Sequence, residues 1–441
     1  MRRVFVLLLL LGGMQLILPL GSEGHGSQAL LSFGFLILAA YTVGEIAIAV
    51  RIPKIVGYLF AGILFGPYVL GVVSAEGTGR LTPVSDLAVA MIAFLAGAEL
   101  RWSEVREHGI VLVKLMTAEL LLAFVAIAAI LYALHGWVPA LSGEPTYEVL
   151  AFVLLFASIA IVHSPAVTMA LLSETHARGP VARTTLGVVL LADVAVVLLF
   201  STTLTVARSI APAAGAAGPS VGAIVWEIGG ALVIGALIGA AVALYLRMVG
   251  RELVLFGILV AFFGLELAQL THVELLLTLL TAGFVAENVS PHGEKLRHSM
   301  ERSAALIFVV FFALSGAKID VRAAAPLLPL VIPIAAVRAA AIWGGIQLGA
   351  RWAGARPAER QYVWMGLVSQ AGVAIGLATI VADAYPGRGE ALRGMLLALI
   401  ALNETVGPIL FRRALERAGE MPRPGGATAD AVTTDPAPDQ G

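Results

Sequence analysis

The sequence is dominated by apolar runs of about 20 residues that follow one another along almost the whole chain. Such a run, as a helix, is long enough to cross the roughly 30 Å hydrocarbon core of a bilayer. Hydrophobic residues make up 59% of the 441 residues and charged residues only 13%, against roughly 25% charged in soluble domains. We therefore expect an all-α polytopic membrane protein. The expected thirteen spans are 27–50, 53–73, 83–100, 109–135, 147–173, 180–208, 219–247, 251–269, 272–288, 299–316, 324–353, 359–383 and 388–413.

The ends of the chain and the distribution of basic residues predict its orientation. Residues 1–24 run from Arg2-Arg3 through an apolar stretch to small and polar residues, which is typical of a signal peptide; a fourteenth, retained helix is the alternative. One set of alternate loops carries most of the 28 Lys and Arg residues, as cytoplasmic loops do. We expect a bacterial-type inner membrane protein with a cytoplasmic C-terminus and a periplasmic mature N-terminus.

Several classes of function are disfavoured by what the sequence lacks. A net charge of −1 leaves no large basic field for nucleic acid, and the absence of cysteine excludes thiolate metal sites and redox dithiols. No P-loop, His-Glu-x-x-His or Gly-x-Ser-x-Gly motif is present. We expect neither an enzyme nor a bound cofactor, and no metal beyond a transported ion. Residues 418–441 predict a disordered cytoplasmic tail without a nucleotide-binding regulatory domain.

Two short motifs occur twice, and their spacing predicts an inverted repeat. Leu95-Ala96-Gly97-Ala98-Glu99-Leu100 resembles Leu314-Ser315-Gly316-Ala317-Lys318-Ile319, and Ala61-Gly62 resembles Ala282-Gly283. Both pairs lie seven expected spans apart, and an odd offset makes equivalent helices cross in opposite directions, as in many secondary transporters. The transport domain is expected at 25–417, with repeats at about 27–208 and 251–413 joined by a linker helix at 219–247.

Interrupted helices at corresponding places in the two repeats point to a transport site. The span 147–173 contains His163-Ser164-Pro165, and the span 359–383 contains Ser369-Gln370-Ala371-Gly372. Proline removes a backbone donor and glycine weakens helical preference. Exposed carbonyls and helix C-terminal ends suit a cation. A simple kink and a helix-packing patch are the structural alternatives. The residues expected to line the site are His163, Ser164, Ser369 and Gln370.

Asp193 and Arg338 are the clearest charged residues in the middle of expected spans. Asp193 lies thirteen residues after Pro180, or about 20 Å along a helix, and an aspartate at the bilayer centre costs about 2.5–3.5 kcal/mol. A desolvated carboxylate can hold either a proton or a small cation, so Asp193 is the predicted carrier. Arg338 does not readily lose its proton. It is expected either to compensate charge at the site or to form a structural ion pair.

The sequence leaves the roles of two further titratable residues undecided. His163 either titrates at the helix break or is a neutral side chain that binds the opened backbone. Glu119, about nine residues into the span 109–135, is a candidate second proton relay. Both lie within expected spans, where ionisable side chains are rare.

The sequence resembles the monovalent cation:proton antiporters of the Kef and Nha type over nearly all of residues 27–417. Taken together, the matching stretches are highly specific. They are Ile52-Pro53-Lys54-Ile55-Val56-Gly57-Tyr58-Leu59-Phe60-Ala61-Gly62-Ile63-Leu64-Phe65-Gly66-Pro67, Phe94-Leu95-Ala96-Gly97-Ala98-Glu99-Leu100, Gly366-Leu367-Val368-Ser369-Gln370-Ala371-Gly372-Val373-Ala374 and Leu402-Asn403-Glu404.

This resemblance implies a fold and assigns roles to particular residues. It implies a core domain and a dimerisation domain, two broken helices that cross beside the ion-binding aspartate, elevator-like movement and a homodimer. Asp193 matches the ion- and proton-binding aspartate, and Arg338 matches the basic residue on the helix before the second broken one. Two positions depart from the family pattern: Ala192 stands where Asp, Asn or Gln is usual, and His163 stands where Thr or Ser is usual.

The expected function is secondary transport in which Na⁺ or K⁺ and H⁺ compete for Asp193 under alternating access. One carboxylate exchanges one charge, so electroneutral exchange is expected. The alternative is an ion-coupled carrier of an organic solute on the same scaffold, which the altered residue at position 192 keeps open. The partners expected are the cation, protons, the lipid bilayer and a second copy of the chain.

Overall fold

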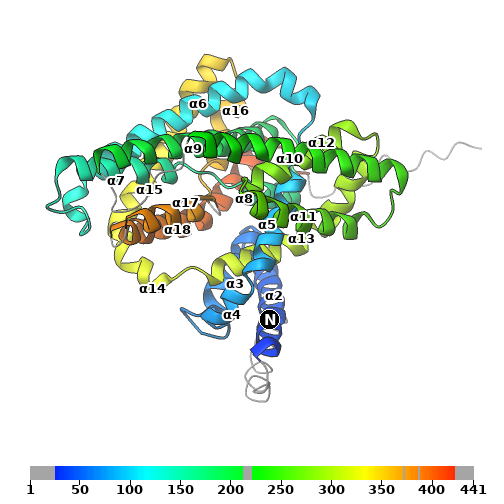
Figure 1. Ribbon diagram of the computed structural model, residues 1–441, viewed down its shortest axis with the longest axis horizontal. Helices are drawn as coiled ribbons and strands as arrows, with labels where there is room; N and C mark the ends of the chain where they lie inside the picture. Colours follow the sequence, from blue (N-terminus) through cyan, green and yellow to red (C-terminus); the bar gives the residue numbers. More distant parts are fainter. Residues whose placement is uncertain (1–24, 212–220, 371–372, 386–387, 423–441) are drawn as a thin grey trace, which may run out of the picture.

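The computed structural model describes residues 25–211, 221–370, 373–385 and 388–422, and the regular structure in these ranges is helical (Figure 1). The predicted signal peptide and most of the predicted tail lie outside these ranges. The helices are α2 (His25–Ala49), α3 (Lys54–Phe65), α4 (Ala75–Arg80), α5 (Thr82–Ala98), α6 (Trp102–Ala133), α7 (Thr146–Ala160), α8 (Pro165–Thr175), α9 (Pro180–Ile210), α10 (Val221–Met248), α11 (Leu253–Thr271), α12 (Leu275–Val289), α13 (Gly293–Ala317), α14 (Val321–Ala324), α15 (Leu328–Ala353), α16 (Pro357–Gly366), α17 (Val373–Ala384) and α18 (Arg388–Ala418), with 3₁₀ turns η2 (His135–Trp137) and η3 (Ala325–Leu327).

Every predicted span contains a helix, but the helices differ in length. Eight helical stretches of the described chain are long and apolar enough to cross a bilayer, or nine if the bent α13 is included. Shorter apolar helices occupy Lys54–Phe65, Thr82–Ala98, Leu275–Val289 and Val373–Ala382. The fold class predicted from the sequence is confirmed, whereas the number thirteen stays a prediction.

The second predicted span, 53–73, begins where its helix begins but extends past the end of that helix. Helix α3 ends at Phe65, and its C-cap Gly66 has extended backbone angles. Pro67 follows, and the residue before a proline is pushed out of the helical region. The α-helix is therefore 12 residues long, which is about 18 Å. Figure 1 shows α3 and α4 beside α2.

Glycines in the two repeated motifs make reciprocal backbone contacts. A Cβ atom at Gly62 of α3 would collide with the carbonyl oxygen of Ala313 in α13, and one at Gly283 of α12 would collide with that of Phe94 in α5. Ala313 and Phe94 each lie three residues before the glycine of the repeated hexapeptide. The pairs α3–α13 and α5–α12 thus cross in equivalent ways, each joining one motif from either half of the chain. These contacts support the predicted inverted repeat.

The second glycine of each pair completes the pattern. A Cβ at Gly316 would meet the Leu59 carbonyl oxygen, and one at Gly97 would meet that of Leu280. Leu59 and Leu280 both lie three residues before the glycine of the Ala-Gly motif. Small residues at such crossings let helix backbones approach closely. We call these four glycines, Gly62, Gly97, Gly283 and Gly316, the glycine seam.

Helix α9 lies at the boundary between the two large apolar clusters of the described chain. One cluster contains much of α3, α5, α12 and α13 together with Leu186 and Leu190 of α9. The other contains much of α6, α7, α15 and α17 together with Val189 and Val196 of α9. Because Asp193 is on this helix, it lies where the two clusters meet.

Candidate ion-binding site

The first broken helix opens at the predicted place. Helix α7 ends at Ala160 and α8 begins at Pro165. Ser164 is the N-cap of α8, and its hydroxyl accepts a hydrogen bond of 3.1 Å from the backbone N–H of Val167. Proline at the first helical position needs no intrahelical donor. The sequence Ser-Pro therefore starts a new helix, and the carbonyls at the end of α7 are left without helical partners.

The second broken helix opens between α16 and α17, and its described residues meet the first break. The Gln370 side-chain amide donates to the carbonyl oxygen of Ala160 at 2.7 Å. Asn403 of α18 donates to the Gln370 Oε1 at 2.7 Å, which fixes the orientation of that amide. Residues Ala371 and Gly372 of the predicted motif lie outside the described residues. The two breaks are thus joined directly by hydrogen bonds.

Arg338 of α15 lies between the two breaks and binds the carbonyls of both. Its side chain is fully buried. Its Nε donates to the Ala160 oxygen at 2.6 Å, and its Nη2 donates to the Val162 oxygen at 2.9 Å. Its Nη1 donates to the Val368 oxygen at 2.6 Å. A helix C-terminus carries partial negative charge, so this guanidinium stabilises two half-helix ends at once.

His163 contacts both the second break and Glu119. Its Nδ1 lies 2.7 Å from the carbonyl oxygen of Leu367, and its Nε2 lies 3.1 Å from the Oε2 of Glu119. Both side chains have 0% exposure. The imidazole thus contacts the opened backbone, as one of the two predicted roles requires. It also contacts the Glu119 carboxyl group, which neither role included.

Asp193 lies beside the first break without a direct bond to these groups. It lines a cavity of about 40 Å³ together with His163, Ser164 and Pro165 of the break, which is larger than the roughly 10–15 Å³ that one water needs on this measure. Its Oδ1 is buried and has no hydrogen-bond partner among the described residues. Its neighbour Ala192 is fully buried in the apolar cluster around α7.

The structure separates the predicted site residues into two groups. His163 and Ser164 share the cavity with Asp193, whereas Arg338 and Gln370 lie at the crossing of the breaks and are not among the residues that line it. Ser369 is buried, and its hydroxyl has no hydrogen-bond partner in the described chain. The breaks therefore form a backbone scaffold behind the aspartate.

Glu274 is a carboxylate near Asp193 that the sequence analysis did not single out. It is the N-cap of α12 and lines a second cavity of about 20 Å³ with Asp193 and Ile228. It lies in the connection between α11 and α12, so its sequence position indicates a helix cap rather than a residue close to α9. The sequence feature that could have identified Glu274 is its position directly before an apolar run. The same feature is expected of an ordinary helix N-cap, so it does not indicate a site residue.

Helix α9 is fixed at its first turn by the last described residues of the chain. The backbone N–H groups of Val181 and Ala182 donate to the Glu420 carboxylate at 2.7 and 2.8 Å. Gly179 leaves room for this carboxylate, because a Cβ there would overlap it. A carboxylate at a helix N-terminus is stabilised by the helix dipole. Residues 418–422 of the predicted tail thus hold the helix that carries Asp193.

A much larger cavity, of about 630 Å³, opens on the side of the protein where basic residues gather. It is lined by Arg101, Arg178, Arg183 and Arg297, together with Glu99 and Glu294. Arg297 also donates to Glu99 at 3.2 Å. Because basic residues are concentrated in cytoplasmic loops, the side predicted to face the cytoplasm carries this wide opening.

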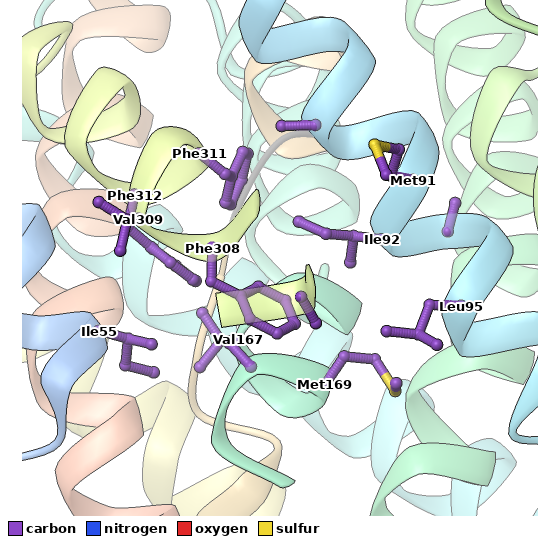
Figure 2. Packing of buried hydrophobic residues seen from close by; sticks show 14 of the residues in the cluster. Ile55, Met91, Ile92, Leu95, Val167, Met169, Phe308, Val309, Phe311 and Phe312 are labelled. Atoms are coloured by element: carbon purple, nitrogen blue, oxygen red, sulfur yellow. The ribbon is translucent and has the colours of Figure 1, made fainter. Parts of the chain in front are cut away.

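An apolar layer separates the large cavity from the small one beside Asp193. Leu95 and Met169 line the large cavity, whereas Ile92, one turn earlier on α5, lines the small one. Figure 2 shows Ile92, Leu95 and Met169 around the same packed region, with Val167 of α8 and Phe308 of α13 next to them. All five side chains are at most 3% exposed. Packed apolar side chains therefore lie between the large cavity and Asp193.

Comparison with known proteins decides the family. Residues 34–416 match the family model described as sodium/hydrogen exchanger, transmembrane. The chain belongs to this family. The chain is therefore a multi-pass membrane protein of a family of secondary transporters and not of enzymes.

Solved structures show the same fold. The sodium proton antiporter MjNhaP1 from Methanocaldococcus jannaschii superposes on this chain in two structures. One, determined at pH 8, has a TM-score of 0.67 and 17% identity, and covers 89% of this chain and 99% of the antiporter. The other, from an electron-microscopy map, has a TM-score of 0.70 and 16% identity, with 89% and 98% covered. At this identity the likeness establishes the architecture of the chain alone.

A curated relative matches over a shorter stretch. The protein named iron transporter MagA, from Paramagnetospirillum magneticum (strain ATCC 700264 / AMB-1), is 30% identical over 163 residues. That match spans 36% of this chain and about one third, 34%, of the relative.

Proposed function

We propose that the protein exchanges a monovalent cation, Na⁺ or K⁺, for protons across a bacterial-type inner membrane, and that Asp193 binds the cation and the proton in turn. The observation that carries this proposal is the Asp193 Oδ1, which is buried without a hydrogen-bond partner among the described residues and faces a small cavity at the first helix break. A carboxylate oxygen in such a place has unused capacity for a proton or a small cation.

The architecture supplies what this exchange needs besides the carboxylate. The crossing breaks fix the cavity wall, because Arg338 and Gln370 bind the carbonyl ends of both. Asp193 has a large cavity on the arginine-rich side, beyond the apolar layer, and shares a second cavity with Glu274. Opening on alternate sides of α9 would expose the same carboxylate to either compartment, as in other transporters with a central site.

One carboxylate at the site supports the exchange of one monovalent cation for one proton, and hence electroneutral exchange. The residue before Asp193 is Ala192, so the position offers no second carboxylate or amide oxygen. The family resemblance also supports a homodimer with a core and a dimerisation domain. The predicted orientation places the large cavity on the cytoplasmic side.

The ion-coupled transport of an organic solute remains the alternative function. The cavity that Asp193 shares with the first break measures about 40 Å³, and pockets for small organic ligands are usually about 300–1,000 Å³. The size of this cavity favours an inorganic cation. The name of the relative matched over 163 residues, iron transporter MagA, adds iron to the cations to be tested, and Fe²⁺ is the form used in the test.

The test uses purified protein reconstituted into liposomes that carry a proton gradient. Adding Na⁺ or K⁺ between pH 6 and 9 is expected to collapse the gradient, without net charge movement, and Asp193→Asn is expected to abolish the response. Asp320→Asn is the matched control: Asp320 is an N-cap outside the site that accepts bonds from Arg322 and Ala323, and asparagine can cap a helix equally well.

Two results would count against this proposal. Exchange that persists in Asp193→Asn would remove the carrier role of the aspartate. A wild-type protein that responds to none of Na⁺, K⁺ and Li⁺ would favour the alternative, and a response to Fe²⁺ alone would redefine the cation.

A further inference from the structure

Three ionisable side chains are fully buried at the crossing of the broken helices, and ion exchange at Asp193 uses none of them as a carrier. They are Glu119 on α6, His163 at the first break and Arg338 on α15, each with 0% or 1% exposure. Buried ionisable groups inside a membrane are costly and mark proton or ion pathways. Glu119 and His163 form the closest pair, with 3.1 Å between Oε2 and Nε2.

The hydrogen-bond partners of His163 show that this pair holds a proton. A carbonyl oxygen can only accept, so the His163 Nδ1, which lies 2.7 Å from the Leu367 oxygen, must carry a hydrogen. A bond between Nε2 and the Glu119 Oε2 then needs one more hydrogen, either on the imidazole or on the carboxylic acid. In both forms the pair binds the same number of protons and has no net charge.

Helix packing brings the pair against a fixed positive charge. Gly345 lies two turns after Arg338 on α15, and a Cβ atom at Gly345 would collide with the Cα atom of Glu119. Glycine at this position therefore permits the close approach of α6 and α15. The Arg338 Nη2 lies 3.5 Å from the His163 Nδ1, and Glu119 attracts the guanidinium electrostatically.

We propose that Glu119 and His163 form a second proton-binding site, a dyad that shares one dissociable proton and controls the helix crossing behind Asp193. This inference rests on the proposed exchange function for its link to transport, but the proton site itself does not. The proton stays with the protein rather than crossing the membrane, so the dyad regulates exchange and leaves its stoichiometry unchanged.

Loss of the dyad proton removes the bond that joins α6 to the first break. The Glu119 carboxylate and the His163 Nε2 would then face each other as two acceptors at 3.1 Å, which is repulsive. The carboxylate gains by turning towards Arg338, whose guanidinium holds the Ala160 and Val368 carbonyls. Because His163 also lines the Asp193 cavity, the change is transmitted to the ion site.

The second carboxylate oxygen of Glu119, Oε1, is buried without a hydrogen-bond partner among the described residues, and the core helices carry other polar groups. On α7, Ser158 donates to the Leu155 carbonyl at 2.8 Å. On α18, Asn403 binds Gln370, and the neighbouring Glu404 is 5% exposed. On α9, Asp193 shares the cavity with His163. Arg338 on α15 is the basic group beside the dyad. When the pH rises and the dyad loses its proton, the Arg338 guanidinium therefore faces one additional negative charge.

The direct test counts the dyad proton in purified protein, without any transport. Infrared difference spectra across a pH titration report protonated carboxylic groups and, with isotope-labelled histidine, imidazole. Wild type is expected to show a coupled carboxyl and imidazole change that is lost in Glu119→Gln and altered in His163→Gln. The change should persist in Asp193→Asn and in the control Glu107→Gln, which alters an exposed residue of the same helix.

A glutamine at position 119 is informative because its amide can still donate to the His163 Nε2 but cannot release a proton. In liposomes, Glu119→Gln is therefore expected to keep cation exchange and to lose the part of its pH dependence that comes from the dyad. Glu107→Gln is expected to keep the wild-type pH profile.

The outcomes separate the dyad from the proposed function. If Glu119→Gln titrates like wild type in the infrared spectra, the dyad holds no dissociable proton and the inference is overturned. If the spectra change but the pH profile of exchange does not, the regulatory part is overturned. If wild type shows no exchange of any cation, the proposed function fails while the spectra still decide the proton site. If Glu119→Gln does not fold, His163→Gln provides the same spectral comparison.

Discussion

At the scale of single residues, Arg338 has the greatest structural importance among the described side chains of the site. Its planar guanidinium donates to carbonyl oxygens that belong to two different broken helices. A buried charge is tolerated when its donors are all engaged, and here the acceptors are the free ends of half-helices. The same contacts therefore satisfy the guanidinium and the opened backbone.

Replacing Arg338 is expected to destabilise the protein more than replacing an exposed arginine. Arg338→Ala leaves the buried carbonyls of Val162 and Val368 without a donor, at about 1–3 kcal/mol each, while the Ala160 oxygen keeps the Gln370 amide, so most of the protein should fail to fold. Arg338→Lys keeps the charge but cannot reproduce the planar fork and should lower the melting temperature. Thermal unfolding in detergent measures this. Arg351→Ala, on the exposed surface of the same helix, is the control, and equal melting of the two alanine variants would contradict the prediction.

The sequence identifies the charged residues of the site more readily than their partners. Asp193 and Arg338 stand out because each is a charge within a long apolar run, and Pro165 marks a helix break for steric reasons, whereas the helix end at Gly66-Pro67 was missed. The contact between Glu119 and His163 joins residues 44 positions apart, and Glu274 reaches the Asp193 cavity from another part of the chain. Such proximities depend on helix crossings, which periodicity and composition do not specify.

At the scale of elements, the glycine seam determines how closely α3 approaches α13 and how closely α5 approaches α12. Each of its four glycines faces a carbonyl oxygen of the opposing helix. Backbone oxygens cannot rotate away as side chains can, so a methyl group at these positions has to push two helices apart. The repeated hexapeptide was visible in the sequence, but its partner motif was visible only as two residues, Ala-Gly.

Alanine in the seam is expected to cost stability in both equivalent crossings. Gly62→Ala and Gly283→Ala should each destabilise the protein by about 1–3 kcal/mol, as overpacking does, and the effects should be similar because the contacts are equivalent. Gly109→Ala in α6 is the control, since a Cβ there meets nothing within 4 Å and alanine favours a helix. Melting temperatures of the three variants check this; a stable Gly62→Ala would show that the crossing can relax.

At the scale of the whole molecule, the protein has a wide opening on one side of Asp193 and closed packing between that opening and the ion site. The opening lies among Arg101, Arg178, Arg183 and Arg297. Arg101 and Arg178 lie outside the helices, whereas Arg183 and Arg297 lie near the starts of α9 and α13. The positive-inside rule predicts the cytoplasmic side for all four. The sequence thus predicts the sidedness of the opening, whereas its volume depends on how α5, α8 and α13 pack.

The orientation can be tested with single cysteines, because the chain contains none. Ser173→Cys, which places a thiol in the large cavity, is expected to react with a membrane-impermeant thiol reagent from the cytoplasmic side of the membrane. Ala75→Cys, on the exposed surface of α4, is expected to react from the periplasmic side. Labelling of intact cells and of inverted vesicles, detected on gels, distinguishes the two. The reversed pattern would invert the topology.

The glycine seam also has a consequence for biogenesis. Helix α3 is synthesised about 250 residues before α13, so it enters the bilayer long before the backbone it packs against has left the ribosome. Until then its glycine face meets lipid or the insertion machinery, and α5 is in the same position with respect to α12. The first half of the chain therefore cannot mature on its own during translation. Its native interior closes only when the second half arrives, so a cut between α9 and α10 should leave two fragments that each depend on the other for assembly.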